Sequence, residues 1–158
     1  MSGTIVLGIG NRLGGDDAAG TCVVEILNQG QHKTRALLPT EIMAIDVGTA
    51  PESYTSVIRR HRPDLLILID AADMGLPPGV LRVITREKIS ILSFSTHNIP
   101  LSTFISYVDE FCGEILLVGV QPQQTGIGNG LSKAVRKSVK KLAEIILEGR
   151  TAQIPLLE

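Results

Sequence analysis

The pattern of apolar and polar positions along the chain predicts strands that alternate with helices. Residues 4–9 and 65–71 are short, continuous apolar runs, which are typical of strands that are covered on both faces in a parallel sheet. The stretch 80–85 follows too soon for a crossover helix, so we expect an antiparallel strand at the sheet edge. The predicted strands cover residues 4–9, 41–46, 65–71, 80–85 and 115–120.

Helical periodicity occupies most of the chain between these strands. Apolar side chains recur at spacings of 4, 3 and 4 from Val135 to Ile146, which places them on one face of a closing helix. We expect Asp16 or Asp17 to cap the first helix and Gly30 to end it. The predicted helices cover residues 17–28, 48–60, 100–111 and 132–148.

This alternation predicts a three-layer α/β/α fold with a five-stranded, mostly parallel, twisted sheet and one antiparallel edge strand. With the strands in the order 2-1-3, a ligand crevice opens at the carboxyl ends of the first and third strands. The length of 158 residues fits one domain, which we expect to cover residues 1–149, followed by a tail over residues 150–158.

Composition and charge exclude several classes of partner. The net charge of −1 gives no general attraction to nucleic acid or to a membrane surface. No apolar run approaches the roughly 20 residues that a membrane-spanning helix needs, and Met1-Ser2-Gly3 leads into a strand without a signal peptide. We therefore expect a cytoplasmic protein and, because no stretch has the pattern of an exposed apolar face, a monomer.

Candidate chemistry lies at the ends of the predicted strands. The glycine-rich turn after the first strand carries two adjacent aspartates, the second of them Asp17, and so favours a cation over a phosphate. Asp70 ends the most hydrophobic run, and His97 precedes a helix. Two carboxylates and an imidazole suit a borderline divalent transition metal better than calcium or magnesium. Spacing alone leaves the choice open, because Asp46 and Asp73 also lie near strand ends.

Five motifs follow one another without a large insertion between residues 4 and about 148. They are Gly8-x-Gly10-Asn11-x-Leu13-x-x-Asp16-Asp17-x-x-Gly20, Asp46-x-Gly48-Thr49, Leu68-Ile69-Asp70-Ala71-x-Asp73, Ser95-Thr96-His97-Asn98-Ile99-Pro100-Leu101 and Gly119-Val120-Gln121-Pro122. In these motifs the chain resembles the maturation endopeptidases of [NiFe]-hydrogenases. It is most similar to the branch that processes the large subunit of membrane-associated, hydrogenase-3-like enzymes. One difference is Ala18, where many members have glycine.

The resemblance implies an endopeptidase that removes a short C-terminal peptide from a [NiFe]-hydrogenase large-subunit precursor once nickel has been inserted. The family's nickel-contacting positions, which would also carry out catalysis, fall on Asp17, Asp70 and His97. The nickel would be supplied by the substrate, whose cysteines would complete its ligands. The loops of the substrate cleft would include Gly48, Thr49 and Gln121. Each of these three residues also fits an ordinary turn at a strand end.

Proteases of other classes would show motifs that this chain lacks. No serine or cysteine sits in a recognisable elbow with a partner histidine, and Ser95 is only two residues from His97. A zinc protease would show two histidines on a helix followed by a further ligand, and that pattern is absent. The sequence does not identify which group activates the water, a carboxylate or the metal.

Two functions of other classes stay open. Gly8-x-Gly10 after the first strand is similar to the start of a dinucleotide-binding fingerprint, although Leu13 stands where the third glycine belongs. A non-catalytic chaperone that checks for nickel would use the same three ligands as the endopeptidase. Failure to bind a nucleotide would dismiss the first function, and an activity assay separates the second from a peptidase.

Overall fold

The computed structural model describes residues 3–34, 41–94, 99–128 and 130–158. Its elements follow in the order β1 (Thr4–Ile9), η1 (Gly15–Ala18), α1 (Ala19–Thr34), β2 (Ile42–Gly48), η3 (Pro51–Tyr54), α2 (Thr55–His61), β3 (Leu65–Ala71), β4 (Leu81–Val83), α3 (Arg86–Ile89), α4 (Leu101–Val108), η4 (Asp109–Phe111), β5 (Glu114–Val120), α5 (Lys133–Leu147) and η5 (Thr151–Gln153), where η marks a 3-10 helix. In the described ranges, no helix combines the length and the apolar character needed to cross a membrane.

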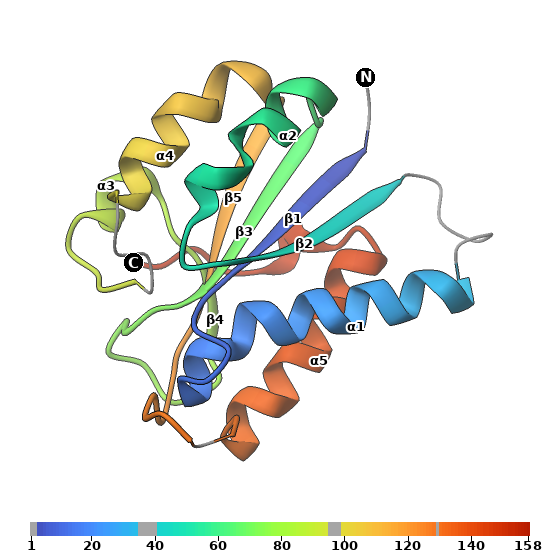
Figure 1. Ribbon diagram of the computed structural model, residues 1–158. Helices are drawn as coiled ribbons and strands as arrows, with labels where there is room; N and C mark the ends of the chain where they lie inside the picture. The colour runs from blue at the N-terminus through green and yellow to red at the C-terminus, as the bar shows by residue number, and fades with distance from the viewer. Residues whose placement is uncertain (1–2, 35–40, 95–98, 129) are drawn as a thin grey trace.

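The sheet has five strands in the order β2-β1-β3-β5-β4 (Figure 1). β1, β2, β3 and β5 are parallel, and β4 runs antiparallel to β5 at one edge. The predicted sheet, including its antiparallel edge strand and the 2-1-3 order, is confirmed. Because the strand order reverses between β1 and β3, their carboxyl ends border the crevice in which open α/β sheets bind ligands.

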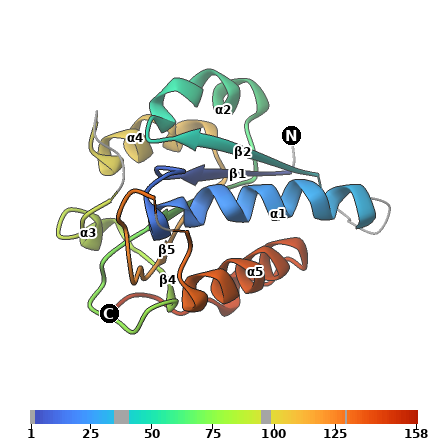
Figure 2. The same ribbon diagram turned by 60° about the horizontal axis from the view of Figure 1, so that its bottom comes forward.

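Helices cover both faces of this sheet and complete the three predicted layers (Figures 1 and 2). α1 and α5 pack side by side on one face, where Val23, Leu27 and Leu142 are fully buried. α2 and α4 cover the other face and bury Ile58 and Phe104. Each such side chain stabilises the fold by about 1.5–3 kcal/mol relative to leaving it exposed.

Gly8 in β1 and Gly20 in α1 bring strand and helix into direct backbone contact. A Cβ atom on Gly8 would lie 2.3 Å from the carbonyl oxygen of Gly20, and one on Gly20 would lie 2.6 Å from the carbonyl oxygen of Ile69. Both distances are too short for a real Cβ atom, so the missing side chains permit this approach. The first turn of α1 is therefore packed directly against the ends of β1 and β3.

Two features of the helices differ from the prediction. α1 is preceded by the 3-10 turn η1 and continues through Gly30 to Thr34. The predicted stop at Gly30 is wrong, because glycine inside a helix costs only about 0.5–1 kcal/mol relative to alanine and does not end the helix by itself. The short helix α3 also forms between the predicted strand 80–85 and the predicted helix 100–111, where no helix was predicted.

Residues 150–158, predicted as a tail, fold back onto the edge strand β4. Val83 donates its amide to the carbonyl oxygen of Pro155 and accepts a hydrogen bond from the amide of Leu157, each at 2.8 Å. These bonds form a short parallel bridge, and Ile154 is buried in the adjoining core. The C-terminal segment thus covers the outer side of β4.

Candidate active site

Asp17 lies in η1, directly after the turn that follows β1. Its side chain is half-buried. A Cβ atom on Gly14 would stand 3.2 Å from Oδ2 of Asp17 and 3.3 Å from the Cβ of Asn11. The absence of a side chain at Gly14 therefore lets Asp17 and Asn11 come together at the carboxyl edge of the sheet.

Asp70 stands near the end of β3 and is fully buried. It pairs in register with Gly119 of β5. Because alternate side chains of a strand point to opposite faces, Asp70 shares its face with Leu68, which packs on the side covered by α2 and α4. Burying a carboxylate is costly unless polar or charged groups compensate, which makes Asp70 a candidate for function rather than for packing.

The contact between α1 and β3 brings these two aspartates to the same edge. Gly20 is packed against the carbonyl oxygen of Ile69, the residue before Asp70, and η1 contacts β3. The turn that carries Asp17 and the strand end that carries Asp70 are therefore neighbours, as the predicted strand order requires.

His97, the third residue of the predicted site, lies outside the described residues. The helix that follows it, α4, begins at Leu101, which is buried on the same face of the sheet as Leu68. Within the described part of the chain, no three His, Cys, Asp or Glu side chains come together as a metal site. The nickel-binding and catalytic roles of Asp17, Asp70 and His97 stay predictions.

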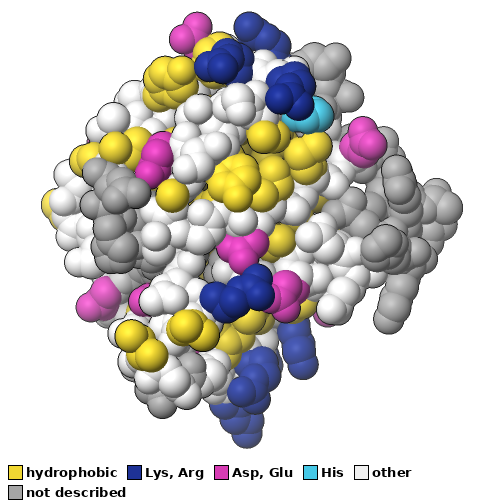
Figure 3. Space-filling view, in the orientation of Figure 1, with side chains coloured by type: hydrophobic (Ala, Val, Ile, Leu, Met, Phe, Trp, Pro, Cys, Tyr) yellow, Lys and Arg dark blue, Asp and Glu magenta, His cyan; other side chains and the backbone are white. Residues whose placement is uncertain are grey.

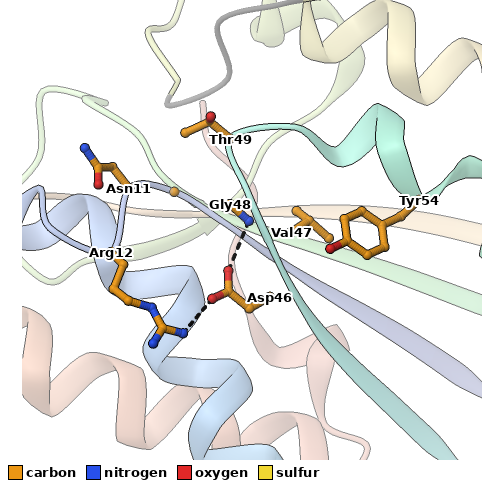
Figure 4. Close-up of a pocket in the computed structure, with 8 residues that line it drawn as sticks. Asn11, Arg12, Asp46, Val47, Gly48, Thr49 and Tyr54 are labelled. Carbon is orange, nitrogen blue, oxygen red and sulfur yellow. Dashed lines mark hydrogen bonds and ion pairs between the residues drawn. The ribbon is translucent and has the colours of Figure 1, made fainter.

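An open pocket with a volume of about 650 Å³ lies at the carboxyl ends of β1 and β2 (Figure 4). The turn after β1, the end of β2 and η3 form its walls. Its lining residues are Gly10, Asn11, Arg12, Asp46, Val47, Gly48, Thr49 and Tyr54. Gly48 and Thr49, predicted as cleft residues, both line this pocket, and Asn11 connects it with Asp17. Contact of the pocket with a substrate stays a prediction.

Asp46 is held inside the pocket by three donors, and Figure 4 shows two of them, Arg12 and Gly48. Nη2 of Arg12 lies 2.8 Å from one carboxylate oxygen, and the other oxygen accepts hydrogen bonds from the Gly48 amide at 3.0 Å and the Thr21 hydroxyl at 3.2 Å. Burial raises the pKa of Asp46, but these hydrogen bonds and the charge of Arg12 outweigh burial and leave the pKa below its usual value. Asp46 is therefore an anion that orients Arg12.

Arg12 is a pocket residue that the sequence motifs did not predict as part of the site. Its side chain stays 64% exposed while it contacts Asp46 at 2.8 Å and Glu25 at 3.7 Å. Basic and acidic side chains adjoin in the middle of the face shown in Figure 3, below a group of hydrophobic ones. The only local sign of a role for Arg12 is its place in the glycine-rich turn, because Asp46 is 34 residues away.

Asp16 is fully buried and anchors the loop between β5 and α5. Its carboxylate accepts hydrogen bonds from the backbone amides of residues 123 and 124 at 2.8 and 2.9 Å, and from the amide and hydroxyl of Ser132 at 2.7 and 2.9 Å. Of the two aspartates that were predicted as the cap of the first helix, Asp16 does not fill that role, because its carboxylate reaches the start of the last helix instead. The two adjacent aspartates thus differ in role, and Asp16 is structural.

A family model described as hydrogenase maturation protease, HycI, matches residues 23–149. The chain belongs to this family. It is 34% identical over 137 residues to the hydrogenase 3 maturation protease of Escherichia coli K12, covering 86% of this chain and 83% of the relative. It is 30% identical over 150 residues to the hydrogenase 2 maturation protease of the same organism, covering 90% of this chain and 87% of the relative.

Solved structures of hydrogenase maturation proteases have the same fold. A crystal structure of the hydrogenase 3 maturation protease matches with a TM-score of 0.84 at 32% identity, covering 99% of this chain and 97% of that chain. HycI from Thermococcus kodakarensis KOD1 matches with a TM-score of 0.79 at 33% identity, covering 94% and 92%. The chain is accordingly a peptidase.

In this maturation protease, Gln121 organises the loop that follows β3. Its side-chain oxygen accepts hydrogen bonds from the amides of Met74 at 2.7 Å and Leu76 at 3.3 Å, and its nitrogen donates to Asp73 at 3.2 Å. Hydrogen bonds from Gln121 and from the Gly75 amide lower the pKa of Asp73. Gln121, predicted as a cleft residue, is only 6% exposed, so it supports the loop from within.

The cysteines of this maturation protease are not set up as nucleophiles. Cys22 and Cys112 are both half-buried and free. Burial raises the pKa of Cys22, with a further contribution from Glu25, and burial together with Asp109 raises the pKa of Cys112 to about 11. Because the thiolate is the reactive form, a raised pKa makes both thiols poorer nucleophiles than a free cysteine. This agrees with the expectation that the peptidase is not of the cysteine class.

Proposed function

We propose that this peptidase removes the C-terminal peptide of a [NiFe]-hydrogenase large-subunit precursor after nickel insertion. One observation carries the proposal: in a hydrogenase maturation protease, Asp17 and Asp70 reach the same sheet edge beside an open polar pocket. The precursor is the partner in this proposal, without nucleic acid or membrane insertion. A monomer and a cytoplasmic location, predicted from composition, complete it.

Nickel enters the proposal as part of the substrate. Asp17 and Asp70 would supply carboxylate oxygens and His97 an imidazole nitrogen, a donor set that suits a borderline divalent metal. Cysteines of the precursor would complete the ligands. The metal then serves as the recognition element, because only a precursor that already carries nickel offers these three residues something to bind.

Cleavage is proposed to proceed by attack of water on the carbonyl carbon of the scissile peptide bond. A carboxylate of the site accepts a proton from the water as the new C–O bond forms, and the proton passes to the departing amine nitrogen as the C–N bond breaks. Asp70 is fully buried, whereas Asp17 is half-buried and adjoins the pocket through Asn11. Asp17 therefore has the better access to water and is our choice for the base.

The pocket is proposed to hold the substrate backbone next to the scissile bond. Gly48 leaves room for an approaching chain, and the Thr49 hydroxyl and the Arg12–Asp46 pair offer polar contacts. Holding the peptide in a fixed position relative to the attacking water is itself a large part of the rate gain in such reactions.

Intact-mass spectrometry of a large-subunit precursor incubated with the peptidase tests the proposal. The same precursor without nickel is the matched control. We expect loss of a C-terminal peptide only from the nickel-loaded form. Equal cleavage of both forms would remove nickel from the proposal, and no cleavage of either form, with binding demonstrated, would remove the proposed substrate.

A further inference from the structure

The two edge strands of the sheet, β4 and β2, differ in whether another segment covers their outer side. The outer side of β4 is covered by the C-terminal segment through the hydrogen bonds of Val83. At the opposite margin, β2 pairs with β1 alone among the described residues (Figure 1). Natural proteins protect edge strands with lysine, proline or a covering segment, because an unpaired edge accepts another chain. The seven residues of β2 include no Lys, Arg or Pro.

The outward-facing backbone groups of β2 follow from its pairing. The Thr4 amide donates to the carbonyl oxygen of Glu41 at 2.9 Å, so the backbone of Glu41 faces β1. Backbone groups alternate in direction along a strand, and the register is regular from Thr4 to Gly8, which turns the backbone of Ala44 and Asp46 outward. A weak contact from outside the sheet agrees, since the Asn28 side-chain amide lies 3.4 Å from the Ala44 carbonyl oxygen.

β2 leads directly into the candidate active site. Its last three residues, Asp46, Val47 and Gly48, also line the pocket. Asn11 lies on the far wall of the pocket and next to Asp17. A chain that pairs along the outer side of β2 would therefore be delivered into the pocket and toward Asp17.

We propose that the outer edge of β2 is a docking strand for an extended segment of the precursor that adjoins the scissile bond. This inference rests on the proposed function, because it describes how the peptidase would hold the precursor that it cleaves. The segment would add a strand to the sheet and bond to the outward amides of Ala44 and Asp46. Main-chain pairing of this kind recognises an extended backbone and tolerates differences in side chains.

Substitution of Ala44 by proline tests the docking strand in the cleavage assay. Proline removes the outward amide and leaves the inward hydrogen bonds to β1 in place, a position at which edge strands tolerate it. Ala44→Ser is the matched control, because it changes the side chain and keeps the amide. We expect kcat/KM for the nickel-loaded precursor to fall about 2- to 10-fold in Ala44→Pro, as for the loss of one hydrogen bond, and to stay unchanged in Ala44→Ser.

Hydrogen exchange on the unaltered protein is a second test of the docking strand, and it needs no variant. We expect the amides of Ala44 and Asp46 to become protected when nickel-loaded precursor is added. Unchanged exchange together with full activity of folded Ala44→Pro would overturn the docking strand while cleavage upheld the proposed function. Failure of the unaltered protein to cleave would overturn the proposed function, and exchange alone would then decide the docking strand. If the amides of Ala44 and Asp46 became protected at higher protein concentration without precursor, the occupant would be a second copy of the chain. That result would overturn the docking of the precursor on β2.

Discussion

The carboxylate of Asp16 accepts hydrogen bonds from both the amide and the hydroxyl of Ser132, at 2.7 and 2.9 Å, across 116 residues of sequence. With the amides of residues 123 and 124, these bonds tie the turn after β1 to the loop before α5. Asp17 follows in the same 3-10 turn, so the bonds of Asp16 also fix the position of its neighbour at the sheet edge.

Asp16→Asn is expected to lower the free energy of unfolding by about 2–4 kcal/mol, because an amide group cannot accept all of these hydrogen bonds and leaves buried donors unsatisfied. Urea denaturation measures the loss. Ser132→Ala, which removes one hydroxyl and keeps the backbone contact, should cost only about 1 kcal/mol. Equal losses of unfolding free energy in Asp16→Asn and Ser132→Ala would contradict the conclusion that the Asp16 carboxylate holds this loop in place.

Asp17→Asn, Asp70→Asn and His97→Ala are each expected to reduce cleavage of nickel-loaded precursor by about 100-fold or more, the scale of a lost acid–base group. Circular dichroism should show that the variants remain folded. Asp73→Asn is the matched control, because Asp73 is exposed and, within the described part of the chain, its hydrogen bonds come from the Gly75 amide and from Gln121. Full activity in the three site variants would refute the assigned roles.

Gly20→Ala is expected to destabilise the fold by about 1–3 kcal/mol and to impair cleavage, because the new Cβ atom would meet backbone oxygens of Ile9 and Ile69 at 2.6–2.7 Å and push α1 away from the sheet. Thermal unfolding and the cleavage assay measure the two effects. Gly130→Ala is the control, since a Cβ atom there meets nothing within 4 Å. A Gly20→Ala protein as stable as this control would show that the contact can relax without cost.

The Arg12–Asp46 pair makes stability depend on pH. The folded pKa of Asp46 lies below its unfolded value of about 3.9, so the stabilisation is present above that value and is lost as the pH falls through the lowered pKa. Arg12→Met should therefore slightly lower the free energy of unfolding at pH 7, and the difference should shrink below about pH 4. In a protein that already carries Asp46→Asn, Arg12→Met should leave the pH dependence of the free energy of unfolding unchanged. If Arg12→Met still altered this pH dependence, a titrating group other than Asp46 would be the partner of Arg12.

Much of the architecture was predictable from local patterns. The continuous apolar runs of β1 and β3 require cover on both faces, and the short connection after β3 leaves no room for a crossover helix, so β4 had to be antiparallel. The alternation of strands and helices predicted that Asp17 and Asp70 would reach one edge. His97 was assigned by resemblance alone, and its place in the site stays a prediction.

By itself, the sequence determined the layers, the strand directions and the family of this protein, because periodicity, connection length and motifs are properties of neighbouring residues. Only the tertiary structure decided that Asp16 is a buried anchor, that Arg12 pairs with Asp46 and that residues 154–157 cover β4. The physical reason is the same in each case. The partners lie 34 to 116 residues apart, and a carboxylate or an unpaired strand edge does not show in its own sequence which distant donor will satisfy it.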